Sequence, residues 1–185
     1  CGASDDIKIY HHGSWGSSYI NNSGSGALFL ESDDLRFRKA DGNELYFQAV
    51  ADGAVHLYYD NVKTFETFAN GIIVKGPEGG DSEIHLYADE GDDNPDCWKF
   101  STSEDASRSR WMNKNGGSWE TSIECNGDGN VELYYDNTKR FETTSTGGTL
   151  TGNLTVSNNL TVTGEVISSD DININADNKK LNIGA

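Results

Sequence analysis

Hydrophobic and polar residues alternate in short runs along much of this chain. Residues 55–58 (VHLY) and 131–134 (VELY) alternate in this way, a period of two that is typical of a β-strand with one buried face. Asp-Asn follows each run, at 60–61 and at 136–137, and short Asx side chains favour turns. A second alternating run then begins at Lys63 or at Lys139. Each of these two segments is therefore predicted to be a β-hairpin.

The two hairpins belong to an internal repeat. Residues 52–71 (DGAVHLYYDNVKTFETFANG) and 128–147 (DGNVELYYDNTKRFETTSTG) share thirteen of twenty positions at an offset of 76. Upstream, Ile7–Tyr10 recurs more loosely as Ile84–Tyr87. Because repeats decide the architecture of a chain, we predict two β-rich units, residues 1–76 and 77–147, followed by a tail, residues 148–185.

Further short strands are predicted in the first unit at residues 27–30, 35–38 and 44–47. They are separated by turn residues at intervals of roughly 8–12, a spacing that suggests an all-β fold. One candidate helix, around Ser103 to Asn113, lacks a clear apolar stripe. The predicted fold class is all-β, with repetitive β-hairpin or β-sandwich-like units.

The tail has a different pattern, in which apolar residues recur every six positions between Gly, Asn, Thr and Ser. One column consists of Leu154, Leu160, Val166 and Ile172, and a second, broken once at Ser168, of Leu150, Val156, Val162 and Ile174. Such a period predicts short strands that wrap around an axis, in a β-solenoid or in three intertwined chains. One chain alone would bury too little surface to offset its conformational entropy. We therefore expect a triple-stranded β-helix-like shaft in a homotrimer, with both columns packed at the axis; the alternative is a flexible linker.

Composition and charge exclude several classes of partner. The 185 residues carry a formal net charge of -16 and a pI near 4.4, which excludes nucleic acid as a partner because phosphate binding needs clustered Lys and Arg. It also argues against docking on an anionic membrane face. No apolar run approaches the roughly 20 residues that a membrane-spanning helix needs. Leu, Ile, Val and Phe make up only a fifth of the chain, so one self-sufficient core is not expected.

The cysteines and the first residues leave alternatives open. Cys1, Cys97 and Cys125 show no metal-ligand spacing, and a pair between Cys97 and Cys125 stays open. The start, Cys-Gly-Ala-Ser, fits the lipidated first residues of a bacterial surface lipoprotein. However, the last two residues, Gly-Ala, match residues 2–3, which favours a segment of a longer repetitive chain.

Two groups of residues are candidate binding sites. Asp89, Asp92, Asp93 and Asp96 could supply oxygen ligands to Ca²⁺, but EF-hand spacing is missing and a solvated acidic loop is favoured. Trp98, Trp111 and Trp119 could stack on sugar rings; burial in a core short of aliphatic residues is the favoured alternative. No catalytic motif is present, so we expect no enzymatic activity and no cofactor other than this candidate calcium.

Three stretches resemble repeats of virion fibre proteins from tailed bacteriophages, especially marine cyanophages. Residues 7–20 resemble the "IYHDGS…SYI" repeat, residues 131–144 the "VELYYDNSKKFETT" element, and residues 154–164 the "LTVSGNLTVTG" shaft rung. The chain departs from the pattern at His12, where the family usually has Asp, and between residues 92 and 119.

The resemblance implies a homotrimeric tail fibre or other extracellular appendage of the virion, attached to other virion proteins and without enzymatic activity in these repeats. We therefore expect a structural segment that extends and presents host-recognition elements. Two alternatives remain: the segment is itself an adhesin for a host surface glycan, or it is a lipid-anchored bacterial surface protein.

Overall fold

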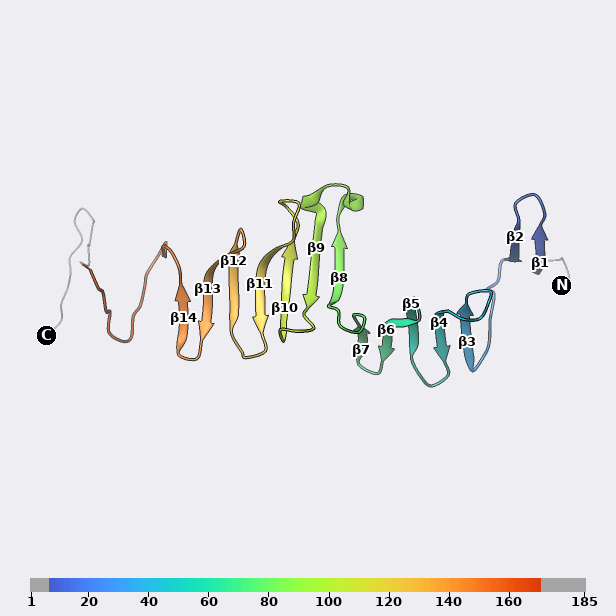
Figure 1. The fold of residues 1–185 in the computed structure, drawn as a ribbon, viewed down its shortest axis with the longest axis horizontal. Coiled ribbons are helices and arrows are strands. Elements are labelled where there is room, and N and C mark those ends of the chain that lie inside the picture. The colour runs from blue at the N-terminus through green and yellow to red at the C-terminus, as the bar shows by residue number, and fades with distance from the viewer. Residues whose placement is uncertain (1–6, 171–185) are drawn as a thin grey trace.

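The computed structural model describes residues 7–170 and is all-β in this range (Figure 1). Its strands form three antiparallel sheets. The first sheet pairs β1 (Ile7–His12) with β2 (Ser17–Asn22). The second contains β3 (Asp34–Arg38), β4 (Leu45–Val50), β5 (Val55–Tyr59), β6 (Val62–Phe68) and β7 (Gly71–Val74). The third contains β8 (Ser82–Tyr87), β9 (Cys97–Thr102), β10 (Arg108–Asn113), β11 (Glu120–Asn126), β12 (Val131–Tyr135), β13 (Thr138–Thr144) and β14 (Gly147–Leu150).

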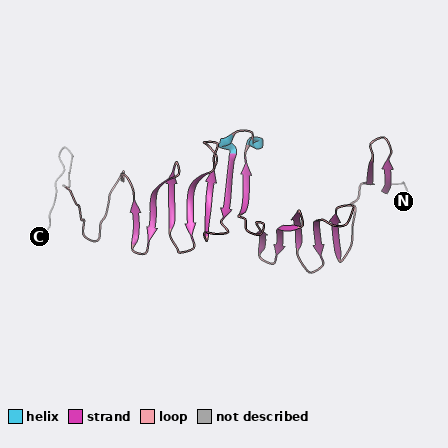
Figure 2. Cartoon of the chain, viewed as in Figure 1, coloured by secondary structure: helices cyan, strands magenta, loops and turns pink. Residues whose placement is uncertain are grey.

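Each sheet is a simple meander in which consecutive strands pair. The sheets follow one another along the long axis of the molecule, and their strands lie across that axis (Figures 1 and 2). Two short 3-10 helices, η1 (Asp89–Gly91) and η2 (Asn94–Asp96), connect β8 to β9. In the part of the chain that the structure describes, each sheet is a single layer, so the predicted sandwich-like packing does not occur within one chain.

The two predicted hairpins are confirmed as β5–β6 and β12–β13. Their turn residues all have positive φ: 49° and 61° at Asp60 and Asn61, and 50° and 54° at Asp136 and Asn137. This left-handed pair matches the right-handed twist of the flanking strands, and Asx residues tolerate it better than most.

The Asn residue of each turn makes the same side-chain hydrogen bond in both copies of the repeat. The Asn61 side-chain oxygen accepts a bond from the Leu45 amide, and Asn137 accepts the equivalent bond from Thr121, each at 2.9 Å. Each turn is thereby tied to the strand that precedes its hairpin. The repeated residues thus encode a three-stranded unit rather than an isolated hairpin.

Two local predictions are wrong. Residues 27–30 form no strand, and the candidate helix around Ser103 to Asn113 is a turn followed by strand β10. In β10, Arg108, Arg110 and Met112 alternate with Ser109, Trp111 and Asn113. This period of two places the members of each set on one face of the sheet. The strand pattern therefore decides the structure here, although the residues before it could begin a helix.

Little of the chain is buried. Among the described hydrophobic residues, only Cys97 and Met112 are almost fully covered, at 6% and 7% exposure. The chain exposes 14929 Å², whereas a folded monomer of 20.2 kDa exposes about 8,800 Å². The isolated chain therefore lacks a core of ordinary size.

Within the described part of the tail, residues 151–170 form no strand. Leu154, Leu160 and Val166 are exposed at 69%, 67% and 61%. These three residues of the first column are consequently left largely uncovered within one chain, and the predicted shaft stays a prediction. In addition, no helix of the described residues is long and apolar enough to cross a membrane.

Candidate interaction face

One face of the seven-stranded sheet carries a continuous row of apolar side chains. Residues paired directly across antiparallel strands project from the same face of the sheet. Following these pairs from β8 to β14 gives one apolar residue from every strand: Ile84, Phe100, Trp111, Ile123, Leu133, Phe141 and Leu150. Because the strands lie across the long axis, this row runs along it.

The five-stranded sheet has the same feature. Its paired residues from β3 to β7 are Phe37, Phe47, Leu57, Phe65 and Val74. Phe37 and Phe47 contact each other, with ring centroids 5.3 Å apart. Leu57 and Phe65 occupy the same places in the repeat as Leu133 and Phe141 of the other sheet.

The two rows meet where the sheets meet. Val74 ends the first row and Ile84 begins the second, and both line one hollow together with Phe100. The rows therefore lie on the same side of the molecule at this junction. We call the combined set, one residue from each strand from β3 to β14, the apolar stripe.

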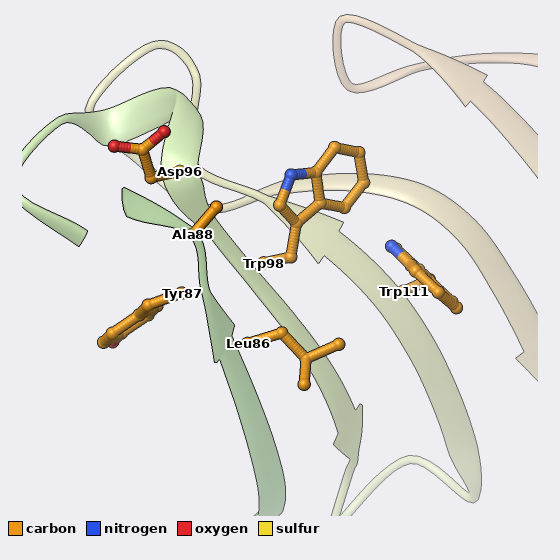
Figure 3. Close-up of a pocket in the computed structure, with 6 residues that line it drawn as sticks. All are labelled: Leu86, Tyr87, Ala88, Asp96, Trp98 and Trp111. Atoms are coloured by element: carbon orange, nitrogen blue, oxygen red, sulfur yellow. The ribbon is translucent and has the colours of Figure 1, made fainter. Parts of the chain in front are cut away.

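Two tryptophans widen the stripe near η2. Trp98 lies two residues before Phe100 and projects from the same face of the sheet. Its ring is edge-on to that of Trp111, with centroids 6.2 Å apart. With Leu86, Tyr87, Ala88 and Asp96 they line an open pocket of about 380 Å³ (Figure 3). Trp98 and Trp111 remain 37% and 39% exposed, so the predicted burial of these rings is only partial within one chain.

The opposite face of the seven-stranded sheet is charged. The paired residues there are Glu83, Ser101, Arg110, Glu124, Glu132, Glu142 and Thr149. Basic residues neutralise part of this row: Lys139 lies 3.2 Å from Glu132, and Arg108 lies 3.9 Å from Glu124. These contacts cover Glu124 and Glu132 to 9% exposure. The charged side chains are therefore better covered within one chain than the apolar ones.

Hydrogen bonds tune the ionisation of this face. A bond from the Tyr134 hydroxyl, assisted by Lys139, holds the pKa of Glu132 below its usual range, although burial acts in the opposite direction. Burial and the bond to Glu132 raise the pKa of Tyr134 to about 12. On β8, burial acts to raise the pKa of Glu83, but bonds from Lys99 and His85 outweigh it, and the pKa is lowered.

The five-stranded sheet has an equivalent charged centre. Glu66 contacts Lys63, Lys75 and His56. A hydrogen bond from Lys63 is the main reason that the pKa of Glu66 lies below its usual value. The five-stranded and seven-stranded sheets therefore each have one charged, internally paired face and one apolar face.

Trp119 is separated from the other two tryptophans of its group. It contacts His85, with ring centroids 5.4 Å apart, and the Lys99 ammonium lies 4.7 Å above its ring. Both neighbours belong to the charged face. The structure thus does not bring the three candidate tryptophans into one site.

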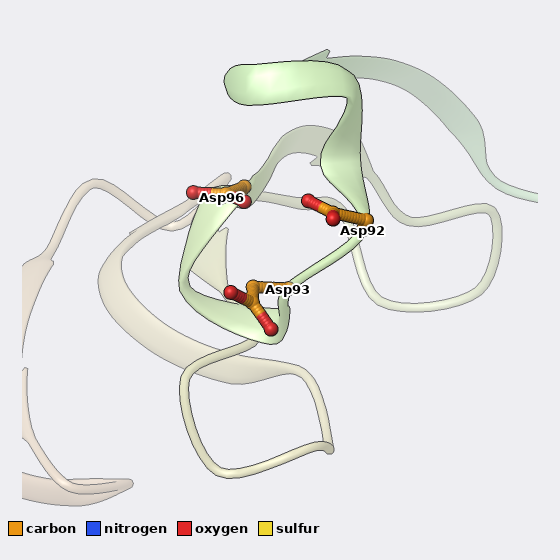
Figure 4. A group of neighbouring side chains, drawn as sticks. All are labelled: Asp92, Asp93 and Asp96. Atoms are coloured by element: carbon orange, nitrogen blue, oxygen red, sulfur yellow. The ribbon is translucent and has the colours of Figure 1, made fainter.

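The acidic loop gathers three of its four candidate aspartates. Carboxylate oxygens of Asp92, Asp93 and Asp96 lie within 4.8 Å of one another around η2 (Figure 4). Asp89 is outside this group. Asp92 and Asp93 are exposed, and the group brings together one oxygen from each of three carboxylates, fewer than the six to eight oxygens that Ca²⁺ takes.

The remaining predicted residues are distributed as follows. Cys97 and Cys125 are both free, Cys97 buried and Cys125 exposed. Leu150 belongs to both the tail column and the apolar stripe, since β14 closes the seven-stranded sheet. Ile172 and Ile174 lie outside the described residues.

Sequence reasoning missed the apolar stripe as a single feature. Each strand displays its own alternation, but the register between strands depends on turn lengths and on the bulges after Phe37, Leu57, Trp111 and Leu133. The signal was present in the repeat, where Leu57 and Phe65 recur as Leu133 and Phe141 at unchanged spacing.

Neither a protein family, nor a curated protein, nor a solved structure matches this chain.

Proposed function

We propose that this chain is a structural segment of a homotrimeric phage tail fibre or similar virion appendage, which extends and presents host-recognition elements. The observation that carries the proposal is the single-layer architecture: meandering sheets follow one another along one axis, and each of the two larger sheets has an apolar face with half-exposed side chains. The three stretches that resemble virion fibre repeats support the same assignment.

The energetics favour association over a solitary chain. A sheet with one apolar face must pack that face against another element to form a stable domain. The chain exposes roughly 6,000 Å² more than a compact monomer of its mass, and a standard protein interface buries only about 1,600 Å² in total. Identical neighbours on more than one side are the simplest way to cover an excess of this size.

Charge favours the same arrangement. A net charge of -16 per chain makes copies repel one another wherever charged faces meet. Contact through the apolar faces avoids this repulsion and leaves the carboxylates in water. The outward charge then keeps neighbouring fibres from adhering. The proposed role requires no catalysis.

Sedimentation equilibrium of the purified chain tests this function, with electron microscopy of the same sample. We expect a particle of three times 20.2 kDa that is elongated rather than round. A compact particle with the mass of one chain at all concentrations would overturn the proposal. Binding of that single chain to a host glycan array would instead favour the adhesin alternative.

A further inference from the structure

We propose that the apolar stripe is the surface along which copies of this chain pack in parallel and in register, around an axis that follows the stripe. The partner is therefore a second and third copy of the same chain. This inference rests on the proposed trimer and adds to it the face, the direction and the alignment of the subunits.

The stripe has the composition of a shared core. Its members come from twelve successive strands and are all aliphatic or aromatic, while the residues next to them along each strand project to the charged face. In the isolated chain Phe37, Leu57, Ile84, Phe100, Ile123 and Leu133 remain between 39% and 50% exposed. Covering such half-exposed side chains completes the burial that the sheet alone begins.

The hollows on the stripe indicate that the cover is protein rather than sugar. The pocket at Leu86, Trp98 and Trp111 has almost entirely apolar walls, and Asp96 is the only charged residue that lines it. Sugar sites combine an aromatic platform with several converging polar groups. Apolar side chains of a neighbouring copy match this pocket and the hollow at the sheet junction.

The direction of packing follows from the tail. Leu150 is the last residue of the stripe and also begins one of the six-residue columns. A shaft of intertwined chains brings equal columns together only when the chains run parallel and without offset. Since β14 joins this tail directly to the seven-stranded sheet, the sheets that precede the tail along the chain must pack in the same direction and register.

A native cysteine reports on this geometry. Cys125 is exposed and lies on the face of the stripe, two residues after Ile123 and paired with Ser109 and Val131. In a parallel, aligned assembly the Cys125 residues of neighbouring copies lie at the same height around the axis. Thr149, paired with Glu142 on the charged face, points away from it.

The test uses a chain with Cys1→Ser and Cys97→Ala, in which Cys125 is the remaining thiol, and a short bis-maleimide cross-linker at micromolar protein. Its matched control carries Cys125→Ser and Thr149→Cys as well. We expect Cys125 to form covalent dimers on the order of a hundredfold faster than the control, because neighbouring groups in one particle have millimolar effective concentrations. Circular dichroism verifies that both variants keep their strands.

The outcomes separate the two proposals. A trimeric mass with no preference for Cys125 over the Thr149→Cys control would overturn the assignment of the stripe while the trimer stands. A monomeric mass would overturn both. If Cys97→Ala prevents folding, the comparison moves to Leu133→Lys and Thr149→Lys in the otherwise unchanged chain. We then expect only Leu133→Lys to abolish the trimer, and survival of the trimer in Leu133→Lys would refute the inference.

Discussion

Replacing Leu133 by alanine measures directly how much of the apolar stripe is buried in the assembled protein. Leu133 is 42% exposed in the isolated chain, so that chain realises somewhat more than half of the burial available to the side chain. Full burial of a leucine is worth about 1.5–3 kcal/mol. In a solitary chain, Leu133→Ala should therefore cost roughly 1–2 kcal/mol.

The cost is larger if the stripe lies at a subunit axis. Truncation of a fully buried leucine typically costs about 2–5 kcal/mol, because the cavity adds to the lost transfer free energy. Three copies meet at the same height in the proposed assembly, so one substitution removes about 6–15 kcal/mol per trimer. Leu57 is the repeat equivalent of Leu133 and is 43% exposed. Leu57→Ala should therefore have a similar effect.

Guanidinium unfolding followed by circular dichroism at two protein concentrations, tenfold apart, distinguishes these cases. For the assembled protein, the unfolding midpoint rises with concentration and falls strongly in Leu133→Ala. Thr149→Ala, on the charged face of the same sheet, should leave it almost unchanged. A midpoint that is independent of concentration, together with a loss of only about 1 kcal/mol in Leu133→Ala, would refute the reasoning.

Three further predictions concern local features of the sheets. Because the pKa of Glu132 is lowered by folding, its contribution to folding stability is present above the ordinary pKa of about 4.3 and is lost as pH falls through the folded value. In thermal unfolding, the stability of Glu132→Gln should therefore depend less on acid pH than that of the unsubstituted chain. An unchanged pH dependence would contradict this. Tyr134 should ionise near pH 12, so absorbance titration of Tyr134→Phe should lose an ionisation step at that pH, and a step that persists there would contradict this. Asn137→Ala removes both a residue suited to positive φ and a 2.9 Å hydrogen bond, for a cost of about 1–3 kcal/mol in denaturant unfolding, and an effect below 0.5 kcal/mol would count against the turn's role.

The β-class and the two hairpins could be predicted because their determinants are local. Alternation in residues 131–134 and the Asx pair at 136–137 act within a few residues of one another, and the structure confirms both. The strand predicted at residues 27–30 failed because its apolar residues find no neighbouring strand to pair with. A strand needs partners for its backbone groups as well as an apolar sequence.

The candidate sites were harder to predict because they depend on register. Trp111 and Trp119 are eight residues apart in sequence, yet they belong to opposite faces of one sheet. The bulge between Trp111 and Met112 and the turn after β10 determine this separation. Composition alone could not distinguish a tryptophan on the apolar stripe from one beside Lys99 and His85.

The orientation of the strands across the long axis has a mechanical consequence. Hydrogen bonds between strands are perpendicular to the strands, so tension applied along the molecule acts along these bonds. Successive strands are spaced about 4.8 Å apart, and each strand pulled free from an end would release a chain segment several times longer than that. Under load, such a segment would lengthen strand by strand. Each step breaks the hydrogen bonds of one strand pair and so dissipates energy.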